Sequence, residues 1–275
     1  MGFSGGLGPG GFNNAIGAGG IDMPAYKRQS SRSNVPRARE LTMWFMAAAN
    51  EKARVCDVSA GGGVNRVRDF SGKRNHLIQI VPAKKPTVKQ GATGGKASFN
   101  FATANWLYGT NATAFDTGTG AFDIYMILNL TAGSANQGIM GTKTGTAASA
   151  AGISLIATSV EKLRGLGSNG SAQKATALTG DNYDDKGYFM VRFFRTGTTT
   201  SIFTLSSDGT TQTINVADAG IDYSGGRMAI GAFNGGGVGF AGDIAEMLAY
   251  KGIRLSAGDK NKVQGYLNTK YKLGI

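Results

Sequence analysis

The chain has 275 residues, of which 41% are hydrophobic and 9% aromatic, so it can bury a core and global disorder is excluded. It contains one cysteine, Cys56, and one histidine, His76, which excludes an internal disulfide framework and a zinc site of nitrogen and sulfur ligands. The formal net charge is +12, and residues 27–96 carry fifteen Lys or Arg against four acids, so the positive field is concentrated near the start of the chain.

Residues 1–40 are predicted to form an extended, glycine-rich and basic arm. Residues 1–34 show neither strand nor helix periodicity, and alone they bury too little apolar surface to offset their chain entropy. We therefore expect the arm to dock on another protein, with scattered apolar side chains as contact points and the bases facing an acidic shell. The predicted partner-binding residues are Phe3, Leu7, Phe12, Ile16, Ile21, Tyr26, Lys27, Arg28, Arg32, Arg37 and Arg39.

Nucleic acid and a membrane are two other possible surroundings for this basic segment. Nucleic-acid phosphates would attract the same charges, but aromatic residues are not interleaved with them at stacking spacing, so an acidic protein shell is preferred. No apolar stretch approaches the roughly 20 residues of a membrane helix, and the first residues lack the pattern of a signal peptide. We therefore expect no membrane contact and no export by that route.

Residues 41–275 are predicted to form one all-β domain that begins with the apolar run 41–47. The alternation in residues 122–130 is typical of a strand with two distinct faces. One face carries Phe122, Ile124, Met126, Leu128 and Leu130, and the other carries Asp123, Tyr125, Ile127 and Asn129. Further strands are expected at 188–195, 201–207, 210–216, 227–234 and 240–250, with a hairpin turn at Asp208-Gly209. Strands without intervening helices indicate an antiparallel sandwich.

One helix is expected, near the C-terminus. Ser256 is followed three residues later by Asp259, which is a capping-box-like start. Apolar and aromatic residues then recur at helical spacing, so this helix should pack on the sandwich through Val263, Tyr266, Leu267 and Tyr271.

Two segments carry a resemblance to a known family. The first spans residues 41–107 and holds a pattern made of Asp69, Ser71, Gly72, Asn75, His76, Pro86, Thr87, Gly95, Lys96 and Phe99. The second begins at Gly242 with GDIAEMLAY and ends in a helix containing Gly-Tyr-Leu. Together they resemble the opening and closing parts of concanavalin A-like, laminin-G-like jelly-roll domains. The resemblance implies an antiparallel jelly-roll β-sandwich, and domains of this class recur in bacteriophage structural proteins.

Catalytic chemistry was sought in the acids and the histidine. Retaining sandwich glycosidases need two carboxylates on one face of a strand, and Asp243 and Glu246, three apart, are predicted to face opposite sides. His76 lies in a turn and is expected to bond local backbone instead of activating a serine. We therefore predict that the protein is not an enzyme.

No cofactor is predicted. The densest acidic cluster is Asp181, Asp184 and Asp185, whose oxygens could hold Ca²⁺. Lys186 adjoins them and the spacing fits no EF-hand, so a solvated loop is preferred and Ca²⁺ stays the alternative.

The resulting hypothesis is a non-enzymatic virion structural protein, a phage capsid decoration or cement protein anchored by its arm. It would be made in the host cytoplasm, sit on the particle surface, and have other virion proteins and its own copies as partners. The alternative is a carbohydrate-binding module of a tail fibre or adhesin, in which Trp106 and Tyr108 stack on a sugar. Packing of these two rings in the core or at its rim is also open, and a glycan hydrolase with unconventional residues is a weaker third hypothesis.

Overall fold

The computed structural model describes most of one compact unit that begins at Val35 and ends at Ile275. The described residues are 35, 37–47, 55–59, 61–133, 135–142, 150–205, 211–233 and 238–275. No helix within these ranges is both long and apolar enough to cross a membrane.

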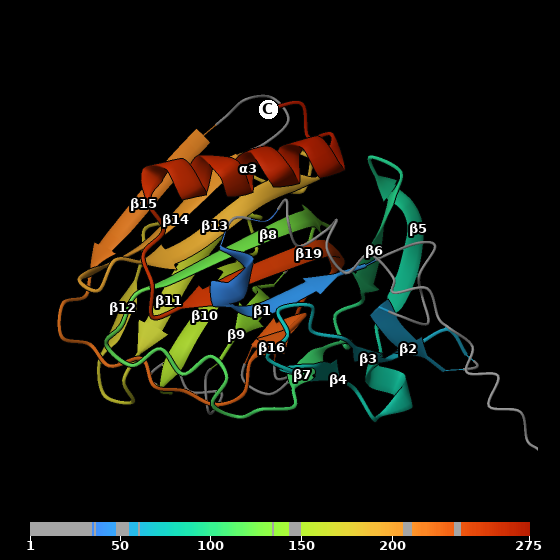
Figure 1. The fold of residues 1–275 in the computed structure, drawn as a ribbon, viewed down its shortest axis with the longest axis horizontal. Coiled ribbons are helices and arrows are strands. Elements are labelled where there is room, and N and C mark those ends of the chain that lie inside the picture. Colours follow the sequence, from blue (N-terminus) through green and yellow to red (C-terminus); the bar gives the residue numbers. More distant parts are fainter. Residues whose placement is uncertain are drawn as a thin grey trace, which may run out of the picture. The chain divides into compact units, whose positions relative to one another are not determined.

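Two antiparallel sheets and a C-terminal helix make up the unit (Figure 1), which confirms the predicted β-sandwich. The eight-stranded sheet runs in the order β15 (Thr211–Ala217), β14 (Thr199–Leu205), β13 (Phe189–Arg195), β8 (Phe122–Leu130), β19 (Gly242–Lys251), β6 (Lys96–Phe101) and β5 (Thr87–Thr93). β1 (Leu41–Met46) pairs with β19 on the same side as β6, further along the strand.

The nine-stranded sheet lies opposite and contains the shorter strands. Its order is β12 (Gln173–Ala175), β11 (Leu163–Ser168), β10 (Gly152–Ala157), β9 (Gln137–Gly141), β16 (Ala229–Ile230), β7 (Leu107–Gly109), β4 (Leu77–Ile78), β3 (Val64–Val67) and β2 (Cys56–Val58). The remaining elements are a ribbon of β17 (Ala232–Phe233) and β18 (Val238–Gly239) and the 3-10 turns η1 (Ala38–Glu40) and η2 (Pro82–Lys84).

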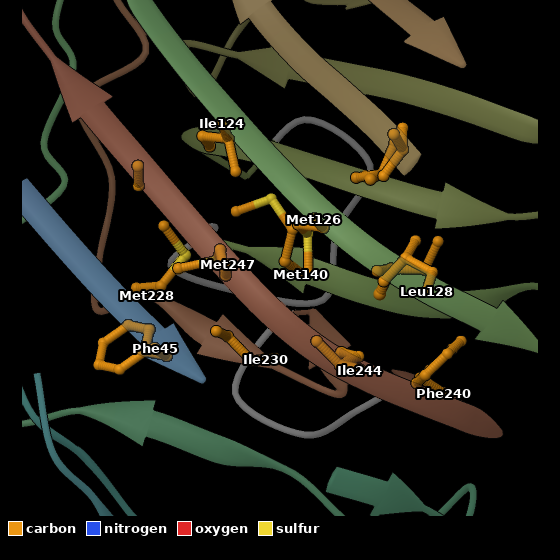
Figure 2. Close-up of a cluster of buried hydrophobic side chains, with 14 of the residues drawn as sticks. Phe45, Ile124, Met126, Leu128, Met140, Met228, Ile230, Phe240, Ile244 and Met247 are labelled. Carbon is orange, nitrogen blue, oxygen red and sulfur yellow. The ribbon is translucent and has the colours of Figure 1, made fainter. Parts of the chain in front are cut away.

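The core lies between the two sheets, where side chains from β1, β8, β9, β16 and β19 meet (Figure 2). The predicted alternation of β8 is confirmed, because its even-numbered residues from Phe122 to Leu130 belong to this core. Cys56 is buried in the same cluster, as expected of a small apolar residue. Closely packed apolar side chains from both sheets therefore hold the sandwich together.

The helix α3 (Ala257–Tyr271) lies against the outer face of the eight-stranded sheet (Figure 1). Ser256 caps it, because the Ser256 hydroxyl oxygen accepts the Asp259 amide N–H at 3.1 Å. Val263, Leu267 and Tyr271 pack into a second apolar cluster with the odd-numbered β8 residues Tyr125 and Ile127. Both faces of β8 are therefore buried, one in each apolar cluster.

Two predicted strands differ in detail from the structure. The expected strand 227–234 is split into β16 and β17 at Gly231. The φ angle of Gly231 is 82°, in the left-handed region, and the Phe101 ring occupies the space where a Cβ atom would lie. In β19 the register shifts between Ile244 and Glu246, so Ala245 is an extra, bulged residue. β14 and β15 form the expected hairpin pair, and the Asp208-Gly209 turn lies outside the described residues.

Candidate functional site

Trp106 and Tyr108 lie together on the outer face of the nine-stranded sheet. Leu107, the residue between them, is fully buried in the core, so the alternation of the strand sends both flanking side chains outward. The two rings are partly exposed, and their centroids are 5.3 Å apart with the planes inclined by 42°. The structure thus brings together the two residues that the sequence nominated for sugar stacking.

The backbone that carries Trp106 is held on both sides. The Trp106 carbonyl accepts a hydrogen bond from Nε2 of the buried Gln79 at 2.9 Å, and Oε1 of Gln79 accepts the Val81 amide at 3.0 Å. The Trp106 amide donates to the Lys84 carbonyl at 3.0 Å. A fixed backbone lowers the entropy lost when a ligand binds, so these contacts preorganise the aromatic pair.

Two exposed apolar residues lie in the segment that is hydrogen-bonded to the Trp106 backbone. Among the described residues four large hydrophobic side chains are strongly exposed, and two of them, Ile80 at 72% and Val81 at 46%, belong to the segment that Gln79 joins to Trp106. Contiguous exposed apolar surface is typical of an interaction site, whereas a single exposed residue is not. This corner of the sheet therefore has the composition of a binding surface.

Two arginines complete this surface. The Arg227 guanidinium carbon lies 5.8 Å from the centre of the Tyr108 ring. Arg66 reaches the same face through register, because it is opposite Ile78, which is opposite Tyr108. Sequence reasoning missed both, since they lie far from residue 108 in the chain and no local pattern connects them.

One internal cavity is too small for a ligand. This cavity of about 10 Å³ is lined by Phe45, Leu77, Phe99, Phe101, Leu107, Ile230, Ile244, Glu246 and Met247. That volume holds roughly one water molecule.

The prediction that Asp243 and Glu246 face opposite sides of their strand is wrong. Asp243 is opposite Asn129 and Glu246 is opposite Ile127, two residues apart on β8, because the bulge at Ala245 adds one residue between the acids. Both carboxylates therefore lie on the outer face of the eight-stranded sheet. A bulge cannot be read from the spacing of acids in a sequence.

Asp243 is almost fully buried, and the chain itself supplies its hydrogen-bond partners. Asp243 accepts hydrogen bonds from Lys89 Nζ at 2.9 Å, Asn100 Nδ2 at 2.8 Å and the Tyr188 hydroxyl at 2.8 Å. Burial, aided by Asp243, raises the pKa of Tyr188, so this phenol stays a donor. These partners hold Asp243 in the sheet and leave it turned away from solvent.

Glu246 is buried beneath α3. Glu246 accepts hydrogen bonds from Trp44 Nε1 at 2.6 Å, Lys270 Nζ at 2.7 Å, the Tyr271 hydroxyl at 2.8 Å and the Tyr266 hydroxyl at 3.0 Å. Burial together with the Glu246 charge raises the pKa of Tyr271. Four donors from β1 and α3 thus converge on one carboxylate and tie the helix to the sheet.

His76 bonds the local backbone, as predicted. Its Nδ1 accepts the Asp69 amide at 3.0 Å, while the Asp69 carboxylate accepts the amides of Trp44, Ser71 and Asn75 at 2.9–3.0 Å. Burial lowers the pKa of His76, and the positive charge of Arg66 lowers it further. The Asp-x-Ser-Gly-x-x-Asn-His segment is therefore a turn between β3 and β4 that is hydrogen-bonded to β1.

The other predicted sites lie elsewhere. Asp181, Asp184 and Asp185 occupy a loop, and no three His, Cys, Asp or Glu side chains in the described ranges are grouped to hold a metal ion. Of the predicted arm residues, Phe3 to Arg32 lie outside the described residues. Arg39 is exposed, and Arg37 pairs within the chain, with Glu40 at 2.6 Å and Asp259 at 3.0 Å.

The comparisons with known proteins identify the fold but no family. No protein-family model matches the chain, and no curated protein matches it. Among solved structures, an arabinofuranosidase complexed with arabinofuranosyl-alpha-1,2-xylobiose has a TM-score of 0.60 at 13% identity, over 84% of this chain and 63% of that one. The ligand binding domain of botulinum neurotoxin serotype D, in complex with N-acetylneuraminic acid, has a TM-score of 0.55 at 8% identity, over 87% and 53%.

A third match is the Trypanosoma rangeli sialidase, with a TM-score of 0.50 at 15% identity, over 86% of this chain and 33% of that one. This chain thus spans less than two thirds of each of these three solved chains. At such identities the likeness shows the β-sandwich fold and nothing finer. It gives no support to the predicted phage context.

The prediction that the protein is not an enzyme is overturned by these matches. Glycoside hydrolases, an arabinofuranosidase and a sialidase, are among the structures that share the fold. One argument behind the prediction also fails, because the bulge at Ala245 puts Asp243 and Glu246 on one face. The fold and the acid spacing therefore exclude no hydrolytic activity.

Proposed function

We propose that this chain binds carbohydrate on the outer face of the nine-stranded sheet, at the surface formed by Trp106, Tyr108, Ile80 and Val81. The observation that carries the proposal is the pair of partly exposed rings, 5.3 Å apart, on a strand whose middle residue is anchored in the core. This was the alternative hypothesis at the sequence level.

The chemistry of a sugar fits such a surface. A pyranose ring presents C–H groups on its faces and hydroxyl groups at its rim, so it needs an apolar platform beside hydrogen-bonding groups. Trp and Tyr supply both, because their rings are apolar while the indole N–H and the phenol O–H are polar. The Trp106 backbone is fixed in advance by hydrogen bonds to Gln79 and Lys84, which limits the entropic cost of binding.

The structural neighbours support the proposal at the level of the fold. One is an arabinofuranosidase solved with an arabinofuranosyl-xylobiose, and another is a neurotoxin domain solved with N-acetylneuraminic acid. Two chains that contain this fold were thus solved in complex with a sugar. Product analysis in the same assay tests for cleavage of the bound sugar.

The test is a glycan array followed by calorimetric titration of the strongest sugar. Trp106→Ala and Tyr108→Ala should each weaken binding by about tenfold to a hundredfold. This is the loss in affinity expected when one aromatic side chain no longer buries apolar surface against the sugar. Leu178→Ala is the matched control, because Leu178 is 41% exposed on a different loop and its truncation should leave affinity unchanged. Equal affinity of all three variants would contradict the proposal.

We also propose, from the sequence alone, that residues 1–40 attach the domain to other proteins of a virus particle. The support is the presence of five Lys or Arg and no acid in residues 27–39. Deletion of residues 1–34 should abolish association with particles and leave glycan binding intact. Retained association after the deletion would contradict this role of the arm.

A further inference from the structure

A row of four register partners crosses the proposed sugar surface, one residue from each of four neighbouring strands. Arg66 on β3, Ile78 on β4, Tyr108 on β7 and Ala229 on β16 are successive register partners. Register partners in an antiparallel sheet point to the same face, and neighbouring strands lie about 4.8 Å apart. Arg66 is therefore about 10 Å from Tyr108 along the row, within the length of a disaccharide.

A second cation lies on the other side of Tyr108. The Arg227 guanidinium carbon is 5.8 Å from the Tyr108 ring centre, and the Arg227 side chain is exposed. The aromatic platform is thus flanked by a guanidinium group toward β3 and another at the start of β16.

Neither guanidinium makes an ion pair within the described part of the chain. Arg192 and Arg195, by contrast, pair with Asp123 and Asp218. Asp57 is the register partner of Arg66, yet its carboxylate contacts Arg68 at 3.4 Å. The Nε atom of Arg66 is buried and has no hydrogen-bond partner.

The surroundings add to the positive field. Residues 63–89 contain seven Lys or Arg and a single acid, Asp69, which is buried in the turn that it caps. A lowered pKa of His76, caused mainly by burial and then by Arg66, agrees with this field. Such a surface attracts anions and disfavours cations.

We propose that the ligand of this surface is an acidic glycan, a sugar chain that carries carboxylate or sulfate groups. Arg66 and Arg227 bind the acid groups, and Trp106 and Tyr108 stack on the sugar rings between them. A guanidinium group binds carboxylate or sulfate through two parallel hydrogen bonds, which a neutral hydroxyl cannot match. The proposal rests on the carbohydrate-binding function above and adds the class of sugar.

The experiment compares matched pairs of sugars on the full chain. The probes are a polygalacturonate hexasaccharide beside its carboxyl-reduced counterpart, and a heparin-derived hexasaccharide beside its desulfated counterpart. We expect at least one acidic probe to bind about tenfold or more tighter than its neutral partner, with affinity that falls as salt rises. The two pairs also show whether carboxylate or sulfate is preferred.

Charge-neutral variants locate the effect. Arg227→Gln, at an exposed position, and Arg66→Gln should each bring the ratio of acidic to neutral sugar affinity most of the way to one. Arg254→Gln is the matched control, because Arg254 is exposed at the approach to α3 and its loss changes net charge equally. If Arg66→Gln fails to fold, Arg227→Gln still decides the question.

The outcomes separate the two proposals. Equal affinity for acidic and neutral sugars, lost in Trp106→Ala, would overturn the acidic ligand and keep the sugar surface. Insensitivity of every probe to Trp106→Ala and Tyr108→Ala would overturn both. Binding of a poly-dT oligonucleotide as tight as that of the best glycan, with the same dependence on Arg227, would overturn the glycan as the ligand class.

Discussion

The outer faces of the two sheets differ in what covers them. On the eight-stranded sheet, α3 buries an apolar cluster, and the acids beneath it are saturated by donors from the chain. On the nine-stranded sheet, at β7, two rings remain partly exposed beside two arginines that make no ion pair with any described residue. The comparison teaches that one outer face serves stability and the other is available to a ligand. Variants of the covered face should therefore change unfolding, and variants of the open face should change binding.

Removal of Glu246 should have the largest effect on stability. In Glu246→Ala, Lys270 keeps a charge at a site where only 20% of its side chain is exposed, and three more donors lose their acceptor. Breaking a buried ion pair from one side costs about 3–5 kcal/mol in the free energy of unfolding. Urea unfolding followed by tryptophan fluorescence measures this loss.

Glu246→Gln is the control for the Glu246 prediction, since it keeps an acceptor and should cost less than Glu246→Ala. Sugar affinity of the folded protein should not change in either variant, because Glu246 faces α3. A loss below about 1 kcal/mol in Glu246→Ala would mean that the covered face does not depend on this carboxylate.

Gln79→Ala tests whether the open face is preorganised. The substitution leaves the Trp106 carbonyl and the Val81 amide without their partner, which should lower the free energy of unfolding by about 2 kcal/mol. It should also weaken sugar binding under conditions in which the variant is fully folded, although the Gln79 side chain is buried. Chemical denaturation and calorimetric titration of the same sample measure both effects.

The conservative variant Gln79→Glu tests whether Gln79 positions Trp106 for binding or only stabilises the fold. It keeps an acceptor for the Val81 amide but cannot donate to the Trp106 carbonyl, so part of the binding defect should remain. An unchanged affinity in both variants, together with lower stability, would make Gln79 a structural residue only.

The sequence predicted the inner face of the sandwich better than the outer faces. The alternation from Phe122 to Leu130 assigned every inward side chain of β8, because one face of a half-buried strand is apolar. The same alternation could not show that α3 covers the other face, since helix packing joins residues more than a hundred positions apart. The bulge at Ala245 was likewise invisible, and with it the shared face of Asp243 and Glu246.

Half of the candidate site was within reach of the sequence. Trp106, Leu107 and Tyr108 alternate locally, so two outward rings around a buried leucine follow from the strand period. Arg66 and Arg227 join them only through the pairing of β3, β4, β7 and β16, and register of short strands is weakly specified by local pattern. The acidic preference therefore depends on information that only the fold supplies.

Ser256→Ala should have a smaller effect, confined to the cover of the eight-stranded sheet. The Ser256 hydroxyl oxygen accepts the Asp259 amide at 3.1 Å, and the hydroxyl donates to the Asp259 carboxylate at 2.8 Å, which lowers the pKa of that carboxyl. Loss of an N-cap costs about 1 kcal/mol. Thermal unfolding measures this loss of stability. Amide hydrogen exchange should become faster in the first turn of α3 and stay unchanged at β7. Faster exchange at β7 would show that the two faces are coupled.

The smallest expected effect is a pH dependence at the basic end of the open face, carried by the single histidine. Because burial and then Arg66 lower the pKa of His76 in the folded state, the unfolded chain takes up a proton first as the pH falls. Stability should therefore be full above pH about 6.5 and decline as the pH drops toward the folded-state pKa. His76→Gln should remove that part of the decline, measured as the urea midpoint against pH.

The His76 pKa also reports on the ligand. An acidic glycan bound to Arg66 cancels part of the positive field, so its saturation should raise the pKa of His76, and the carboxyl-reduced or desulfated sugar should not. Proton NMR of the imidazole in the free and bound protein measures both values. A free-state value at or above about 6.5 would remove the premise of the argument. A lowered value that no acidic sugar shifts would place the bound anion away from β3.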